Sequence, residues 1–255
     1  MFSVASIFGI LLLFIFLVVF TRYQRSGKRG ETVVRLILKT LPNKEYFVLN
    51  DLLLPTSYGT TQIDHIIVSV HGVFVIETKD YKGVISGGEE SETWCKNVYG
   101  NRYSMPNPIR QNKVHVAAVC KILSQLGIGC HVYSVIAFSD SADLRVNCIS
   151  SSCEIVYFYQ LRNTISKYTN VEISHDQVNT IIEQFQKANI VDSEQRKQHV
   201  EDVRANVRER QKKIANGVCP RCGGAIVQRV GRFGNFYGCS NYPKCKFIQN
   251  TTDKL

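Results

Sequence analysis

The stretch that decides the fold runs from Gln62 to Lys79 and reads QIDHIIVSVHGVFVIETK. Two apolar runs rich in β-branched residues, each short enough to form a strand, lie on either side of His71-Gly72. Glycine permits the backbone conformation that a tight turn needs. The pattern therefore predicts a β-hairpin, and we place its two-residue loop at His71 and Gly72.

This hairpin would bring three charged side chains together. With that loop, Asp64 pairs with Lys79, and Glu77 is the diagonal neighbour of Asp64. Because side chains alternate along a strand, all three project from one face, whereas a slip of one residue would move Asp64 to the other. Two carboxylates and an amine on one face can hold a divalent metal beside a charge-stabilising group, as phosphodiester hydrolysis requires. The competing interpretation is a partly exposed charge cluster on a strand pair.

Further motifs accompany the hairpin in order along the chain. They are Gly30-Glu31, Val48-Leu49-Asn50-Asp51, Gly59 to His65, Glu77 to Gly83, Trp94, and Asn107-Pro108-Ile109-Arg110-Gln111. With these motifs the chain resembles the nuclease-related domain (NERD) from about residue 30 to roughly residue 140. The resemblance implies an α/β, restriction-endonuclease-like core of the PD-(D/E)xK class.

The resemblance also implies site residues. Asp64, Glu77 and Lys79 match the catalytic positions, and Glu31 and Gln111 match further motif positions. We expect Asp64 and Glu77 to bind Mg²⁺ (or Mn²⁺), with Glu31 as a further candidate ligand, because all-oxygen ligation suits a hard cation. Lys79 would position the attacking water and stabilise developing charge, and Gln111 would orient groups at the metal.

The rest of the body has the pattern of a mixed α/β domain. Helices are expected at residues 31–41, 108–126 and 178–188, and strands at residues 46–49, 63–76, 83–86, 131–138 and 154–158. Gln111 and His115 are four residues apart and share a helix face. We interpret His115 as a surface or packing histidine, and His65 as a core histidine with one bonded nitrogen.

The N-terminus has the pattern of a membrane anchor. Residues 2–21 carry no charge and are nearly all apolar from residue 4 to 20, and nineteen residues in a helix span about 28 Å, enough for a bilayer core. Arg22, Arg25, Lys28 and Arg29 follow, so the positive-inside rule places residues 22–255 in the cytoplasm. A cleaved signal peptide is the alternative, but no basic residue precedes the apolar run. We expect a single-pass protein of the cytoplasmic membrane.

Positive charge is unevenly distributed. The chain carries a net charge of +10, yet residues 30–191 contain 14 basic and 15 acidic residues. Residues 217–255 contain six basic residues and one acidic residue. Between them, residues 192–216 are crowded with charges of both signs and are predicted to form a solvated helical connector. Electrostatic attraction for a polyanion is therefore expected mainly from the C-terminal part.

Four cysteines predict a metal site near the C-terminus. Cys219 and Cys222 form one pair, and Cys239 and Cys245 form a second pair sixteen residues later. This spacing is typical of tetrahedral zinc binding, and roughly forty residues need the metal to fold. A disulfide framework is disfavoured because the predicted topology puts this segment in a reducing compartment.

The same segment resembles the C-terminal zinc finger of bacterial type IA topoisomerases. The matching residues are Cys219 to Gly224, Gly234 to Cys239, and Ser240 to Cys245. The resemblance implies binding of single-stranded DNA, and aromatic residues interleaved with basic ones fit base stacking and phosphate contact. The candidate DNA-binding residues are Arg221, Arg232, Phe236, Tyr237, Tyr242 and Lys244. The alternative is that the aromatic residues form the small core of the ribbon.

Together these patterns predict a membrane-anchored, metal-dependent nuclease that acts on DNA, single-stranded or branched. The expected divisions are an anchor (1–21), a basic segment (22–29), a nuclease-related domain (30–191), a charged helical linker (192–216) and a Cys₄ zinc ribbon (217–255). One alternative is a catalytically silent protein that tethers DNA to the membrane. Another is a factor that acts on RNA, since stacking alone does not separate the two nucleic acids. A homo-oligomer would permit double-strand cuts, but no pattern in the sequence demonstrates one.

Overall fold

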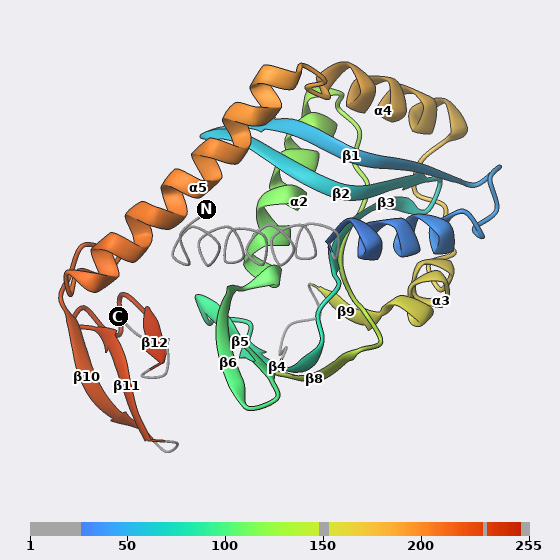
Figure 1. Ribbon diagram of the computed structural model, residues 1–255. Coiled ribbons are helices and arrows are strands. Elements are labelled where there is room, and N and C mark those ends of the chain that lie inside the picture. Colours follow the sequence, from blue (N-terminus) through green and yellow to red (C-terminus); the bar gives the residue numbers. More distant parts are fainter. Residues whose placement is uncertain (1–26, 148–152, 232–233, 251–255) are drawn as a thin grey trace, which may run out of the picture.

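The computed structural model describes residues 27–147, 153–231 and 234–250. It shows a mixed α/β body joined by one long helix to a small β unit at the C-terminal end (Figure 1). The predicted anchor, residues 1–21, and much of the basic segment after it lie outside the described residues. Within the described ranges, no helix has the length and apolar character needed to cross a membrane.

Five strands form the main sheet in the order β1-β2-β3-β7-β9. The β1–β2 and β2–β3 pairs are antiparallel, whereas β7 runs parallel to both β3 and β9. The strands are β1 (Tyr46–Thr56), β2 (Gly59–Ser69), β3 (Gly72–Lys79), β7 (Val132–Phe138) and β9 (Glu154–Tyr157).

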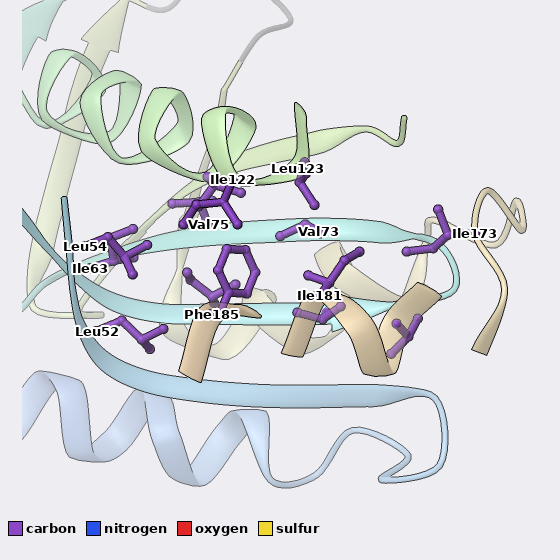
Figure 2. Packing of buried hydrophobic residues seen from close by; sticks show 14 of the residues in the cluster. Leu52, Leu54, Ile63, Val73, Val75, Ile122, Leu123, Ile173, Ile181 and Phe185 are labelled. Carbon is purple, nitrogen blue, oxygen red and sulfur yellow. The ribbon is translucent and has the colours of Figure 1, made fainter. Parts of the chain in front are cut away.

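Helices cover both faces of this sheet. One face packs against α2 (Pro108–Gln125) and α4 (His175–Ala188), with Val73 and Val75 of β3 turned toward them (Figure 2). On the other face, Phe74 and Ile76 pack with a helix over residues 27–38 and with α3 (Leu161–Ser166), which follows the 3₁₀ turn η1 (Phe158–Gln160). Burial on both faces explains why the strands are nearly continuous apolar runs in the sequence.

A second sheet of four strands lies beside the first, in the order β6-β5-β4-β8. Its strands are β4 (Gly83–Gly88), β5 (Thr93–Val98), β6 (Asn101–Pro106) and β8 (Ala142–Asn147). Trp94 anchors it, packed with Ile85, Phe138 and Ile109 in a separate core cluster. The sequence predicted only the first of these strands, because β5, β6 and β8 carry few apolar residues.

The predicted hairpin register is wrong by two residues. Val73 pairs with Val68, not Val70, so the turn lies at Val70-His71 and Gly72 is already the first residue of β3. Gly72 has φ +116°, and a Cβ there would lie 2.8 Å from the His131 carbonyl oxygen at the start of β7. The glycine is thus needed for close packing beside β7, not for the centre of the turn. A two-residue shift preserves the side-chain faces.

The long helix α5 (Ser193–Ala215) connects the body to the C-terminal unit (Figure 1). Asp192 caps it by accepting a hydrogen bond from the backbone N–H of Gln195 at 2.9 Å, and the helix contains no buried residue. The segment that was predicted to be a solvated helical connector thus contains an exposed helix. The small unit contains β10 (Ile226–Gly231), β11 (Gly234–Cys239) and β12 (Ile248–Asn250), and Ile214 of α5 packs against its core.

Candidate active site and metal centre

Asp64, Glu77 and Lys79 lie on the sheet face that α2 covers. Alternation along β3 puts Glu77 and Lys79 on the side of Val73 and Val75, and the observed register continued by one step places Asp64 opposite Glu77. The paired ladder between β2 and β3 ends at His65 and Ile76. Beyond that point the Asp64 carboxylate accepts a hydrogen bond from the backbone N–H of Thr78 at 2.8 Å.

Lys79 connects the sheet to α2. Its ammonium donates to Glu77 Oε1 at 2.5 Å and to the side-chain oxygen of Gln111 at 3.0 Å. Gln111 lies in the first turn of α2, which Pro108 begins and Asn107 caps through a hydrogen bond from the backbone N–H of Ile109. The structure therefore brings Gln111 directly to the lysine.

Burial and mutual charge perturb these groups. Burial, and then the charge of Glu77, raise the pKa of Asp64 well above its usual range. Burial also acts to raise the pKa of Glu77, but Lys79 and His115 outweigh it and hold that pKa below its usual range. Burial alone would lower the pKa of Lys79, yet Glu77 raises it, so the amine stays protonated. The carboxyl groups of Asp64 and Glu77 therefore lie close together beside a single cation, the Lys79 ammonium. There are more acidic than basic groups at this point of the structure.

Glu31 adds to that surplus. It is partly buried on the helix over residues 27–38, and burial followed by the charge of Asp51 raises its pKa. Both Asp64 and Glu77 are within its electrostatic range. Gly30 explains the close approach of this helix, because a Cβ at Gly30 would lie 2.6 Å from Cβ of Asp80.

His115 contacts the candidate site and is buried, which contradicts a surface position and agrees with a packing histidine. Its side chain is buried and its Nε2 lies 3.0 Å from Glu77 Oε2. An ionised carboxylate only accepts hydrogen bonds, so Nε2–H donates to Glu77, and Nδ1 accepts from the Thr61 hydroxyl at 2.7 Å. Position 115 is one helical turn after Gln111, and that spacing was the available signal for its role.

His65 behaves as expected of a core histidine. It is buried, Nδ1 donates to Asn50 Oδ1 at 2.7 Å, and Nε2 has no hydrogen-bond partner. Burial, with help from Arg35, lowers the pKa of His65 to about 4. It is therefore neutral and faces away from Glu77 and Lys79.

The four predicted cysteines form a compact cluster in the C-terminal unit. The ligand atoms of Cys219, Cys222, Cys239 and Cys245 all lie within 4.8 Å of one another. Two of the sulfur–sulfur distances are 3.7 and 3.3 Å, close to the edge of about 3.8 Å of a tetrahedron with 2.3 Å zinc–sulfur bonds. Phe247 is buried against them. The arrangement is compatible with zinc.

The candidate DNA-binding residues of this unit divide into two faces. Phe236 and Tyr237 are consecutive on β11 and so point to opposite sides. Phe236 pairs with Arg229, whose guanidinium lies 5.6 Å from the centre of the exposed Tyr242 ring. Arg221 and Lys244 are exposed, while Arg232 lies outside the described residues.

Comparison with known proteins identifies the body. Residues 26–139 match the nuclease-related domain model. An uncharacterized protein of Bacillus anthracis is 38% identical over 177 residues, which cover 69% of this chain and 82% of that protein. The chain belongs to the nuclease-related domain family. Within that family's motifs lie all five of the candidate catalytic residues.

The C-terminal unit of this nuclease-related domain protein has separate relatives. Residues 216–254 match the topoisomerase DNA-binding C4 zinc finger. DNA topoisomerase 1 of Mycoplasmoides gallisepticum is 42% identical over 53 residues, which are 21% of this chain and 7% of that enzyme. The Methanocaldococcus jannaschii enzyme is 58% identical over 37 residues, 14% of this chain and 5% of that protein. These matches thus cover only a small part of each topoisomerase. No solved structure matches the chain significantly.

Two asparagines that support the nuclease-related domain site were missed by the sequence interpretation. Asn112 is fully buried, and its amide donates to the Val75 carbonyl at 3.1 Å and to the Ser134 hydroxyl at 2.8 Å. It thereby fixes α2 over β3 and β7. Asn107 donates to the carbonyls of Glu89 and Ser91, which holds the start of α2 against the β4–β5 connection. Both flank Gln111 in the sequence.

Proposed function

We propose that this protein is a membrane-anchored, metal-dependent nuclease that hydrolyses DNA phosphodiester bonds. The observation that carries the proposal is the position of Lys79, whose ammonium contacts Glu77 and Gln111 on the face that Asp64 shares. A PD-(D/E)xK nuclease fold for the mixed α/β body is part of the same proposal. The match to the nuclease-related domain supports it.

The residues present fit a divalent cation. Glu31, Asp64 and Glu77 supply three carboxyl groups beside the single ammonium of Lys79, and burial, followed by neighbouring negative charge, raises the pKa values of Asp64 and Glu31. Carboxylate oxygens are the ligands that Mg²⁺ and Mn²⁺ prefer. We assign Asp64 and Glu77 as ligands, with Glu31 in support. The metal would supply a bound water of lowered pKa and a counter-charge for the attacked phosphate.

The remaining side chains prepare the site for that chemistry. Lys79 stays protonated and places a positive charge where a phosphate would gain negative charge during the reaction. Gln111 holds the Lys79 ammonium, and His115 holds the second oxygen of Glu77. Each Glu77 oxygen accepts one hydrogen bond and keeps a second lone pair, so a metal could be bound while both contacts persist.

Substrate binding is assigned to the zinc ribbon. The matching family model is a topoisomerase DNA-binding zinc finger, residues 217–255 carry +5 of the net charge of +10, and Tyr242 and Arg229 offer an exposed aromatic ring and a guanidinium side by side. Exposed aromatic rings favour unpaired bases, so single-stranded or branched DNA is the proposed substrate. The apolar residues 2–21 followed by basic residues support a cytoplasmic membrane location.

Cleavage assays on the full chain test the function. Labelled single-stranded, duplex and branched DNA would be incubated with Mg²⁺ and wild-type protein, Glu77→Ala or Lys79→Ala. We expect each variant to lower the cleavage rate by about 10²- to 10³-fold, because each removes a group that acts on the reacting phosphate. Glu183→Ala, which changes an exposed carboxylate on α4, serves as the control and should cleave like the wild type.

Two outcomes would contradict the proposal. Undiminished cleavage by both site variants would refute the residue assignment. DNA binding without cleavage of any substrate by the wild type would instead favour a catalytically silent protein that tethers DNA to the membrane.

A further inference from the structure

A groove of about 1360 Å³ lies between the second sheet, the C-terminal half of α5 and the zinc ribbon. Its walls include Arg102 and Tyr103 from β6, Arg210 and Lys212 from α5, and Gln249 from β12. Figure 1 shows the long helix running from the body to the C-terminal strands. Three separate parts of the molecule therefore contribute to one concave surface.

An arginine cluster at this junction carries surplus positive charge. Arg110 of α2, Arg210 of α5 and Arg221 of the ribbon lie 2.7, 2.8 and 3.9 Å from the carboxylate of Glu92. Glu92 is nearly buried, whereas the three arginine side chains remain 35, 37 and 40% exposed. One carboxylate neutralises one guanidinium, so two positive charges stay available beside the groove. The other acidic residue of the lining, Glu209, already pairs with Lys213 at 2.8 Å.

Aromatic side chains connect this groove to the candidate active site. Tyr103 is 52% exposed and pairs across the β5–β6 hairpin with Lys96. The Lys96 ammonium lies 5.5 Å from the centre of the Tyr103 ring and 4.9 Å from that of Tyr81. Tyr81 comes two residues after Lys79 and affects its pKa. Rings and cations thus alternate from the groove to the end of β3.

Helix α5 makes a second connection between groove and site. His199 on this helix contacts the Thr60 hydroxyl at 2.8 Å, next to the threonine that holds His115. Arg210, on the groove wall, lies eleven residues further along α5, which corresponds to about 17 Å of helix. The groove and the site are therefore a short distance apart along one rigid element.

We propose that this groove holds a single-stranded segment of DNA between the zinc ribbon and the carboxylate site. Phosphates contact Arg102, Lys212 and the arginines around Glu92, and an unstacked base lies on Tyr103. A polyanion suits the surplus charge, and exposed rings need bases that are not already stacked in a duplex. That the bound DNA leads to the carboxylate site for cleavage rests on the proposed nuclease function. Its binding in the groove does not depend on that function.

Fluorescence anisotropy with labelled oligodeoxythymidine tests the groove, using the full zinc-loaded chain without added Mg²⁺. The variant Arg102→Gln with Lys212→Gln removes two charges from the groove and leaves Glu92 and the four clustered cysteines unchanged; Arg102 also contacts Cys95, at 3.5 Å. Lys187→Gln with Lys197→Gln removes two exposed charges from α4 and the start of α5, outside the groove, and is the matched control.

We expect the groove variant to lose roughly 25-fold in affinity at 0.1 M salt and its salt slope to fall by about 1.4, since each phosphate contact contributes about 0.7 on single strands. Tyr103→Ala should weaken binding by about 5-fold or more. Tyr58→Ala, which removes a fully exposed ring at the β1–β2 turn outside the groove, should not.

Several results would overturn the groove assignment: equal binding by groove and control variants, an unchanged salt slope, or tighter binding of an RNA strand of the same length. Cleavage is measured separately. If DNA binds in the groove but is not cleaved, the proposed nuclease function is refuted and the groove inference stands. If DNA is cleaved equally by the groove variants, the groove inference is refuted and the nuclease function stands.

Discussion

At the scale of single residues, Glu77 is the centre of the candidate site. One of its oxygens accepts from Lys79 and the other from His115, and these partners keep its pKa low despite full burial. Burial of an unpaired carboxylate would be strongly unfavourable. Glu77 can therefore be ionised at this buried position only because Lys79 and His115 donate to it. We therefore propose that His115 acts through Glu77 as a positioning residue.

Replacing His115 tests that role. We expect His115→Ala to raise the Mg²⁺ concentration needed for half-maximal cleavage by about 10- to 100-fold, because the Glu77 carboxylate loses the partner that orients it. His115→Gln retains an N–H donor and should recover part of the loss. Cleavage rates measured across a Mg²⁺ titration report the effect.

His175 supplies the control for that experiment. It is exposed at the start of α4, so His175→Ala should leave the Mg²⁺ requirement unchanged. A His115→Ala protein with a lower maximal rate but the same Mg²⁺ requirement would contradict the positioning role.

At the scale of elements, the β2–β3 turn determines where the site residues stand. Ser69 donates from its hydroxyl to the Gly72 carbonyl at 3.0 Å and accepts from the His71 N–H at 3.2 Å. The Glu172 N–H donates to the Val70 carbonyl, which ties the turn to the segment before α4. These contacts select a turn at residues 70–71 and so place Asp64 opposite Glu77.

Gly72→Ala tests the importance of this turn. The new Cβ would stand 2.8 Å from the His131 carbonyl oxygen at a backbone φ of +116°, so we expect a loss of roughly 2–4 kcal/mol in the free energy of unfolding. Urea unfolding followed by circular dichroism measures it.

Comparison with Gly59→Ala separates the steric part of that loss from the cost of backbone strain. Gly59 has a similar φ of +124° but has no atom within 4 Å of an added Cβ. Its substitution carries the backbone strain alone and should cost clearly less. Equal losses for the two variants would show that contact with β7 does not decide the turn.

At the scale of the whole molecule, the excess positive charge and the candidate active site lie in different parts of the chain. The body is nearly neutral in sequence and holds the carboxylate site, while the ribbon is basic and holds the cysteines. Helix α5 contacts both, through Thr60 at one end and through the ribbon core at Ile214 near the other. Under the proposed function, the ribbon would bind DNA and the body would act on it.

Metal removal should affect the two parts differently. Apart from the cysteines, the described ribbon core contains little more than Phe247, Ile226 and the neighbouring Ile214, too little to fold unaided. We expect a zinc chelator to abolish DNA binding and expose residues 217–250 to protease, while the thermal transition of the body persists. Added Zn²⁺ should restore both properties. DNA binding that survives complete zinc loss would contradict the assignment of the ribbon.

Local patterns were sufficient for much of the fold. The Pro108 start of α2, the charged connector and the cysteine pairs could be predicted because each rests on neighbours in the sequence. The strands β5 and β6 could not, since they carry few apolar residues and are held by Trp94 and by pairing partners rather than by periodicity. Asn112 was missed because only its buried contacts to β3 and β7 distinguish it from a surface amide.

The sequence by itself determined which residues are available: alternation on β3 places Glu77 beside Lys79, and cysteine spacing defines the metal cluster. Only the tertiary structure decided how they meet. The close approach of β7 to Gly72 set the hairpin register, packing of α2 brought His115 and Gln111 to Glu77 and Lys79, and α5 placed the ribbon arginine beside Glu92. The physical reason is that alternation and spacing act over a few residues, whereas these contacts join segments tens of residues or more apart.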